Sequence, residues 1–249
     1  MAFCEYHYFS NSLGKAMAAN IIVPERADRK GPFAVFYLLH GLSDDHSIWQ
    51  RRTSIERYVQ DLPLIVVMPD GGRGWYIDAA EGPAWEASII RDLVPLIDRT
   101  FHTKAERAGR AIGGLSMGGY GALRLSLGNP DMFCSANSHS GAVAFGMRPV
   151  VGTDPNGKEF LRVLGPNSTR GKNDLFALAE KVEKDKLPAM RIDCGASDFL
   201  LNDNRLFHKR LQDLNVAHEY EEFPGSHEWG YWDTHIQQAL AFHRKNLGI

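Results

Sequence analysis

The chain has 249 residues, of which 44% are hydrophobic and 23% charged, and its formal net charge at pH 7 is -2. This size and composition are typical of one α/β domain, so we expect residues 1–249 to form a single domain. The near-neutral charge, without a block of Lys or Arg, argues against nucleic acid as a partner. No run reaches the roughly 18 apolar residues of a membrane span, and the start lacks a signal-peptide pattern. We therefore expect a cytoplasmic protein with no membrane contact.

The three cysteines, Cys4, Cys134 and Cys194, are far apart in the chain and outside any C-x-x-C spacing. Their number and spacing indicate neither a disulfide framework nor a zinc site. We expect reduced, buried thiols and no bound metal.

The chain opens with two strand-like segments, FCEYHYF and MAANIIVP, which predict an antiparallel hairpin joined around residues 12–14. Short apolar or β-rich runs then alternate with amphipathic stretches: AVFYLLHG, LIVVMPDGG, RAIGGLS, FCSANSHSG, MRIDCGASD and AHEYEEFPG. Such alternation predicts a mainly parallel sheet with crossover helices. The helices are expected over residues 48–62, 83–100 with a bend at Pro95, 117–127, 174–184, 204–214 and 231–246.

One serine stands among glycines in GGLSMGG, residues 113–119, between an apolar run and a helix-compatible run. A nucleophile elbow needs small neighbours because the chain turns sharply from strand to helix with the serine in a strained conformation. Gly114 and Gly118 flank Ser116 at the G-x-S-x-G positions. The bare pattern arises by chance in glycine-rich chains. Its context, between an apolar run and a helix-compatible run, favours a nucleophilic Ser116 over a glycine-rich turn whose serine has no catalytic role.

A serine nucleophile needs a base to take its proton and an acid to orient that base. In the elbow-bearing fold the acid and then the base follow the serine, each on a loop after a later strand. The acid candidate is Asp198, whereas Asp193 lies within a predicted strand and Asp203 at a helix start. The base candidate is His227, on the loop after the last strand. Its rival His139 precedes the acid, which breaks the expected order.

Acyl transfer also needs two donors aimed at the developing oxyanion. The amide of Met117 follows the nucleophile directly, and we expect Leu42, in LLHGLSDD, to supply the other amide. Four large apolar side chains are candidates for the wall of a substrate pocket, with core packing as the alternative: Trp75, Phe145, Met147 and Trp229. The irregular stretch at about 145–172, rich in proline and glycine, is expected as an excursion over the active site.

Four segments, LLHGLSDDHSIW, GGLSMGGYGA, CGASDFLL and PGSHEWGYWDTHIQQALAF, together resemble the esterase D-like branch of the α/β-hydrolases. Within that branch, which includes feruloyl esterases and antigen 85 mycolyltransferases, the chain resembles the tributyrin-type carboxylesterases most. The resemblance implies a mostly parallel eight-stranded sheet with an antiparallel N-terminal hairpin and helices on both faces. It also implies Ser116, Asp198 and His227 as the triad, with Leu42 and Met117 as oxyanion donors.

These observations predict a serine carboxylesterase that hydrolyses short-chain acyl esters through an acyl-enzyme intermediate, without a cofactor. S-formylglutathione hydrolases often carry Cys where this chain has Asp44, so that thioesterase activity ranks second. Feruloyl or acetyl-xylan esterase activity is a further alternative, and a hydrolase fold that only binds its ligand is a remote one. The expected partner is a small-molecule ester. The sequence leaves open whether the chain forms a homo-oligomer.

Overall fold

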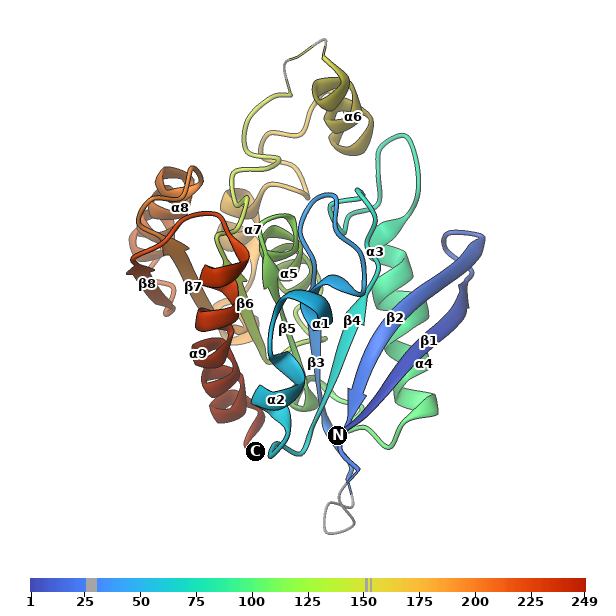
Figure 1. Cartoon of the computed structure of the whole chain (residues 1–249). Helices are drawn as coiled ribbons and strands as arrows, with labels where there is room; N and C mark the ends of the chain where they lie inside the picture. Colours follow the sequence, from blue (N-terminus) through green and yellow to red (C-terminus); the bar gives the residue numbers. More distant parts are fainter. Residues whose placement is uncertain (26–30, 151, 153) are drawn as a thin grey trace.

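The computed structural model describes residues 1–25, 31–150, 152 and 154–249. Within this part of the chain, eight strands form one sheet in the order β1-β2-β4-β3-β5-β6-β7-β8 (Figure 1). The strands are β1 (Ala2–Ser10), β2 (Lys15–Val23), β3 (Ala34–Leu39), β4 (Leu64–Pro69), β5 (Arg110–Leu115), β6 (Ser135–His139), β7 (Ala189–Gly195) and β8 (Glu219–Phe223).

The sheet is antiparallel at one side and parallel elsewhere. Strand β1 pairs with β2 from Ala2 opposite Val23 to Ser10 opposite Lys15, and β2 then pairs antiparallel with β4. All pairs from β4 through β3, β5, β6 and β7 to β8 are parallel. This topology confirms the predicted α/β-hydrolase architecture with its N-terminal hairpin.

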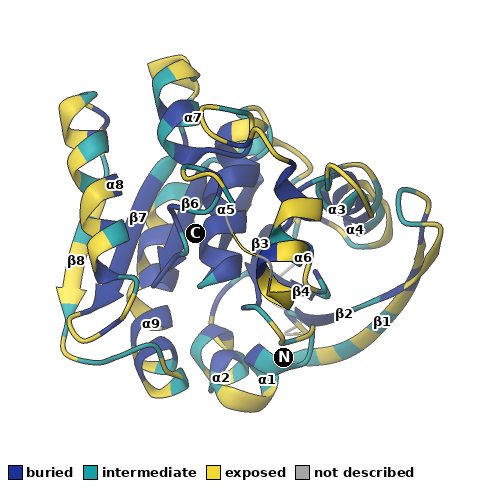
Figure 2. Ribbon diagram, turned by 90° about the horizontal axis from the view of Figure 1, so that it is seen from above, coloured by how far each residue is buried: buried dark blue, intermediate teal, exposed yellow. Residues whose placement is uncertain are grey.

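Helices cover both faces of the sheet, as the view from above shows (Figure 2). One face carries α1 (Ile48–Arg52), α2 (Ile55–Val59) and α9 (Trp229–Leu247). The other carries α3 (Trp85–Ala87), η1 (Ser88–Leu93), α4 (Val94–Thr100), α5 (Met117–Gly128), α7 (Leu175–Lys181) and α8 (Leu201–Asp213). The remaining helical segments are η2 (Arg107–Gly109), α6 (Pro155–Leu164) and η3 (Lys184–Lys186).

Strand β3 illustrates why the sheet is buried on both sides. All six of its residues are apolar and buried. Val35 and Tyr37 pack into the cluster on one face, whereas Phe36 and Leu38 pack into the cluster on the other. A run that is apolar at every position is typical of a parallel strand covered by helices on both faces.

Two predicted helices are interrupted. The helix expected over residues 48–62 breaks at Thr53, whose hydroxyl donates to the Trp49 carbonyl at 2.6 Å, and the Ser54 amide donates to Asp233 at 2.9 Å. The helix expected over residues 83–100 contains the π-helical segment η1 immediately before α4. Pro95, in the first turn of α4, has no N–H to donate backwards, so the preceding turn opens into this wider form.

The predicted excursion contains a helix that the sequence analysis missed, although residues 151 and 153 lie outside the described residues. Helix α6 begins after Asp154, whose carboxylate accepts the amides of Asn156 and Gly157 at 3.0 and 3.2 Å. Pro155 occupies the first turn. An acidic cap followed by proline is a strong start signal for a helix.

The cysteines differ partly from the prediction. All three are free, but only Cys194 is buried, whereas Cys4 and Cys134 are half-buried. Cys4 lies on the edge strand β1, which is covered less completely than the central strands. Among the described residues, no helix is both long and apolar enough to cross a membrane. In the same residues, no group of three or more His, Cys, Asp or Glu side chains is placed to hold a metal ion.

Candidate active site

Ser116 lies at the junction between β5 and α5, in a backbone conformation with φ 52° and ψ -115°. A positive φ is strained for a residue with a side chain, and such strain persists only where the surroundings hold it. Here the Ser116 amide donates to the His139 carbonyl at 2.9 Å, and the Ser116 carbonyl accepts the Ala142 amide at 3.1 Å. The loop after β6 thus holds the serine at the turn.

The glycines of the elbow pack against the end of β3. A Cβ atom added to Gly114 would lie 2.6 Å from the Leu39 carbonyl oxygen, and one added to Gly118 would lie 2.5 Å from the same oxygen. No side chain fits at either position without movement of backbone. The two glycines therefore bring the serine turn into direct contact with the loop that follows β3.

Asp198 and His227 meet across two loops of the chain. Asp198 follows β7, and His227 lies between β8 and α9. The His227 Nδ1 atom is 2.8 Å from Asp198 Oδ2, and the other carboxylate oxygen accepts the Leu200 amide at 2.8 Å. This pairing leaves the imidazole Nε2 for another partner.

The environment keeps the Asp198 carboxyl ionised. Its side chain is fully buried, whereas the His227 side chain is 18% exposed. Burial alone raises the pKa of Asp198, but hydrogen bonds from His227, the Leu200 amide and Ser140 outweigh burial and hold that pKa below its ordinary value. An ionised, fixed acceptor holds the imidazole in the tautomer with the proton on Nδ1.

His139, the rival base, lies in the interior. Its Nδ1 is 2.8 Å from Asp193 Oδ2, and both side chains are fully buried. The Tyr231 hydroxyl donates to the second oxygen of Asp193 at 2.9 Å. The structure thus pairs the rival base His139 with Asp193, one of the two weaker acid candidates, in the protein interior.

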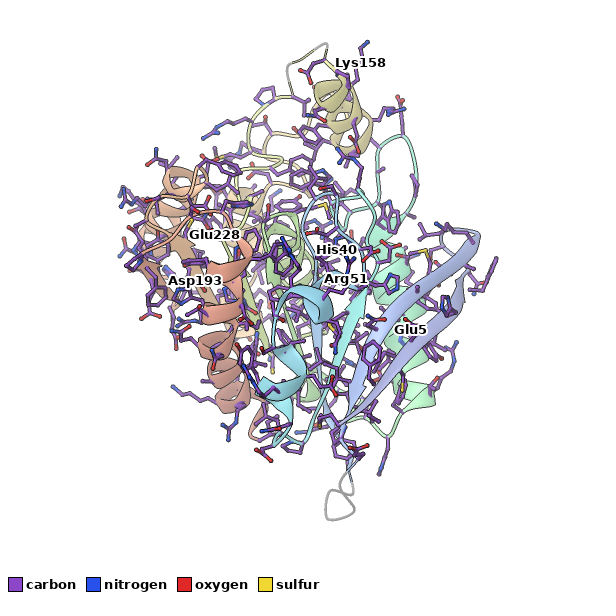
Figure 3. The ribbon with its side chains drawn as sticks, in the orientation of Figure 1. Glu5, His40, Arg51, Lys158, Asp193 and Glu228 are labelled. Atoms are coloured by element: carbon purple, nitrogen blue, oxygen red, sulfur yellow. The ribbon has the colours of Figure 1, made fainter. Side chains whose placement is uncertain are left out.

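The loop after β3 is anchored by the buried His40. Its Nε2 accepts the Gly71 amide at 2.8 Å, so Nδ1 carries the proton and donates to the Gly41 carbonyl at 2.7 Å. Figure 3 shows His40 at the end of β3. In the described part of the chain, no hydrogen bond engages the amides of Leu42 or Met117. Both predicted oxyanion donors therefore have free N–H groups beside the serine turn.

These elements enclose a cleft of about 490 Å³. Ser116, His227 and Leu42 line it, and Asp198 lies behind His227. Figure 3 labels Glu228, the next residue in the chain after His227, at the upper end of α9. The full lining consists of Gly41, Leu42, Asp44, Arg52, Leu115, Ser116, Phe199, His227, Glu228, Trp229 and Trp232.

Of the four predicted wall residues, only Trp229 lines this cleft. The Trp75 and Phe145 rings stack on each other with centroids 3.4 Å apart, and Phe160 of α6 meets both rings edge-on. Met147 follows in the same segment but does not line the cleft either. The alternative interpretation, core packing, applies to the stacked pair because their faces are already covered.

The excursion does not line the cleft in its described residues, although α6 stands at the top of the molecule (Figure 1). It is attached to the loop after β4. Arg73 and Glu159 form an ion pair at 2.7 Å, and the Ala80 amide donates to the Val163 carbonyl at 2.9 Å. These contacts hold α6 beside that loop.

Sequence analysis did not single out Arg52, Phe199 or Glu228 as residues of the cleft, and it considered Asp44 only for the choice between ester and thioester substrates. Asp44 is half-buried, and burial raises the pKa of its carboxyl. Arg52 and Glu228 are exposed at the rim. Phe199 directly follows Asp198 on the same loop. An apolar side chain at that position could have been predicted from the sequence to line the cleft.

Comparison with known proteins places the chain in a family. The family model described as putative esterase matches residues 10–243. An acetyl esterase of Caldicellulosiruptor saccharolyticus is 28% identical over 98% of this chain and 99% of the relative. The chain spans 55% of the length of two esterases of Mycobacterium tuberculosis that are 31% identical to it.

Solved structures agree. The fluorophosphonate-binding serine hydrolase FphF of Staphylococcus aureus superposes with a TM-score of 0.87 at 30% identity, covering 97% of this chain and 98% of that one. The S-formylglutathione hydrolase FrmB of the same species superposes with a TM-score of 0.84 at 31% identity and the same coverage. The chain therefore belongs to the putative esterase family and is an esterase-type hydrolase with the α/β-hydrolase fold.

Proposed function

We propose that the protein is a serine carboxylesterase that hydrolyses short-chain acyl esters through an acyl-enzyme intermediate. The observation that carries this proposal is one cleft lined by a strained, glycine-flanked Ser116 and by His227, which is hydrogen-bonded to the buried Asp198. A serine hydroxyl becomes a nucleophile when a neighbouring base accepts its proton.

In the proposed mechanism, His227 Nε2 accepts the proton of Ser116 as the hydroxyl attacks the ester carbonyl. The amides of Leu42 and Met117 stabilise the oxyanion of the tetrahedral intermediate. His227 then protonates the leaving alcohol, and the acyl group stays on the serine. Water, activated by the same imidazole, releases the acid and restores the enzyme.

The proposal is tested by steady-state kinetics with p-nitrophenyl acetate and butyrate. The variant Ser116→Ala should lower kcat by about 10⁵- to 10⁶-fold, and His227→Ala by a similar factor. Retention of most activity in either purified, folded variant would overturn the assignment. His139→Ala tests the rejected base, and loss of activity there with retention in His227→Ala would exchange the two.

A thioesterase acting on S-formylglutathione is the second candidate. The similarity to FrmB favours it, and Arg52 at the rim of the cleft offers a cation for a carboxylate of such a substrate. A comparison of kcat/KM for S-formylglutathione with that for p-nitrophenyl acetate decides between the two. A ratio far above one favours the thioesterase, and a ratio far below one favours the carboxylesterase.

A further inference from the structure

Phe199 has an unusual position for an apolar side chain. The residue is 76% exposed, more than the other exposed large hydrophobic residues of the described chain. Single exposed apolar residues are common on protein surfaces. This one, however, lines the cleft and follows the buried acid Asp198 directly.

The surrounding loop fixes where this ring lies. The Asp198 amide donates to the Gly195 carbonyl at 3.0 Å, and the Leu200 amide donates to the Asp198 carboxylate at 2.8 Å. Phe199 lies between these two anchored residues. Its backbone is therefore held on both sides, while its ring projects from the loop.

The ring contacts the imidazole. The ring centroids of Phe199 and His227 are 4.5 Å apart, with their planes inclined by 48°. The buried Trp232 meets His227 edge-on at 4.9 Å, and Trp229 meets Trp232 at 5.2 Å. The imidazole thus contacts one buried aromatic ring and one exposed ring, and the exposed ring has free surface to offer a ligand.

The role of His227 in proton transfer indicates which portion of the ester lies beside Phe199. A general acid must come within hydrogen-bond distance of the oxygen that it protonates, and in ester cleavage that oxygen belongs to the leaving alcohol. Groups that flank His227 therefore flank the alcohol portion and not the acyl portion, which becomes attached to Ser116.

We propose that Phe199, together with Trp229, forms an aromatic subsite for the alcohol portion of the substrate and favours esters of aryl or arylalkyl alcohols. This inference rests on the proposed function, because it requires His227 to be the general acid. Stacking on the exposed face of Phe199 covers apolar surface that is otherwise in water.

The test uses two isomeric esters that differ in the position of the aromatic ring. Benzyl acetate carries the ring on the alcohol, and methyl phenylacetate carries it on the acyl group. In Phe199→Ala, the ratio of kcat/KM for benzyl acetate to that for methyl phenylacetate should fall about 3- to 10-fold, mainly through KM. Phe199→Trp should retain the wild-type ratio because it keeps an aromatic face.

Phe9→Ala is the matched control, because Phe9 is 62% exposed on β1 and does not line the cleft. It should leave the ratio unchanged. An unchanged ratio in Phe199→Ala would overturn the inference. A higher ratio, caused by a lower kcat/KM for methyl phenylacetate, would overturn it as well. If the wild type hydrolyses neither these esters nor p-nitrophenyl acetate, the proposed function itself fails.

Discussion

Substitution of Gly118 by alanine tests how closely the elbow depends on its contact with β3. The added Cβ would lie 2.5 Å from the Leu39 carbonyl oxygen and 2.6 Å from that of His40. Neither carbonyl is free to move, because the first accepts Trp49 Nε1 at 2.9 Å and the second accepts the Tyr76 hydroxyl at 3.1 Å. The start of α5 must therefore shift relative to the loop that carries Leu42.

The size of the effect follows from this geometry. Relief of the two contacts requires a displacement of roughly 0.5–0.9 Å, and a misplacement of about 1 Å in an active site costs about 10²-fold in rate. We expect kcat/KM for p-nitrophenyl acetate to fall about 30- to 100-fold. Overpacking should also lower stability by about 1–3 kcal/mol, which corresponds to a Tm lower by roughly 2–12 °C.

Gly230→Ala is the control. Gly230 lies in the first turn of α9, near His227 in the chain, and a Cβ atom added to it would meet no atom within 4 Å. Alanine is preferred to glycine in helices, so this variant should keep wild-type kinetics with an unchanged or higher Tm. If Gly118→Ala kept kcat/KM within threefold of the wild type, the elbow would not need the close contact, and the reasoning would be wrong.

Three further predictions concern acid stability, the acid of the triad and acyl length. Burial lowers the pKa of His243 to about 3, so below about pH 6.5 the unfolded chain takes up a proton that the folded chain does not. Stability should therefore fall by roughly 2 kcal/mol between pH 7 and pH 5 in urea titrations, and His243→Gln should reduce this loss; an equal loss in the variant would contradict the assignment. Asp198→Asn should lower kcat by about 10⁴-fold in ester hydrolysis, and a loss below tenfold would count against Asp198 as the orienting acid. Among p-nitrophenyl esters below their micelle concentrations, kcat/KM should peak at acyl lengths of C2 to C4 and fall at least tenfold by C10. The carboxyl group of Asp44 lines the cleft on the loop that carries Leu42, so each added acyl methylene meets a polar surface and gains little of the ~0.8 kcal/mol that burial of a methylene contributes. A maximum at C10 would show a deep acyl tunnel.

Features that depend on local sequence were predictable. The sheet follows from runs that are apolar at every position and are followed by turn-forming residues, as in β3 and β4. The strained backbone at Ser116 could be predicted from the glycines two residues before and after it, because they leave room for the sharp turn. The chain order of acid and base followed from the elbow-bearing fold, and the loops after β7 and β8 do bring Asp198 and His227 into hydrogen-bond contact.

Features that depend on distant partners were not predictable. The helix break at Thr53 and Ser54 involves Asp233, which lies 179 residues beyond Ser54 in the chain. Trp75 does not line the cleft beside Ser116, and Phe145 from another loop stacks on its ring. The interior position of His139 depends on its pairing with Asp193 from a neighbouring strand. In each case the residue type fits several environments, and only the tertiary contact selects one.

Ser116 is tested as the nucleophile most directly by covalent labelling of the folded protein with a fluorophosphonate probe at neutral pH, followed by mass spectrometry of the labelled peptide. Such probes react with an activated serine and spare ordinary hydroxyl groups. We expect one adduct, located on Ser116, with labelling abolished in Ser116→Ala and strongly slowed in His227→Ala. An unlabelled wild-type protein, or an adduct on any other serine, would contradict this assignment.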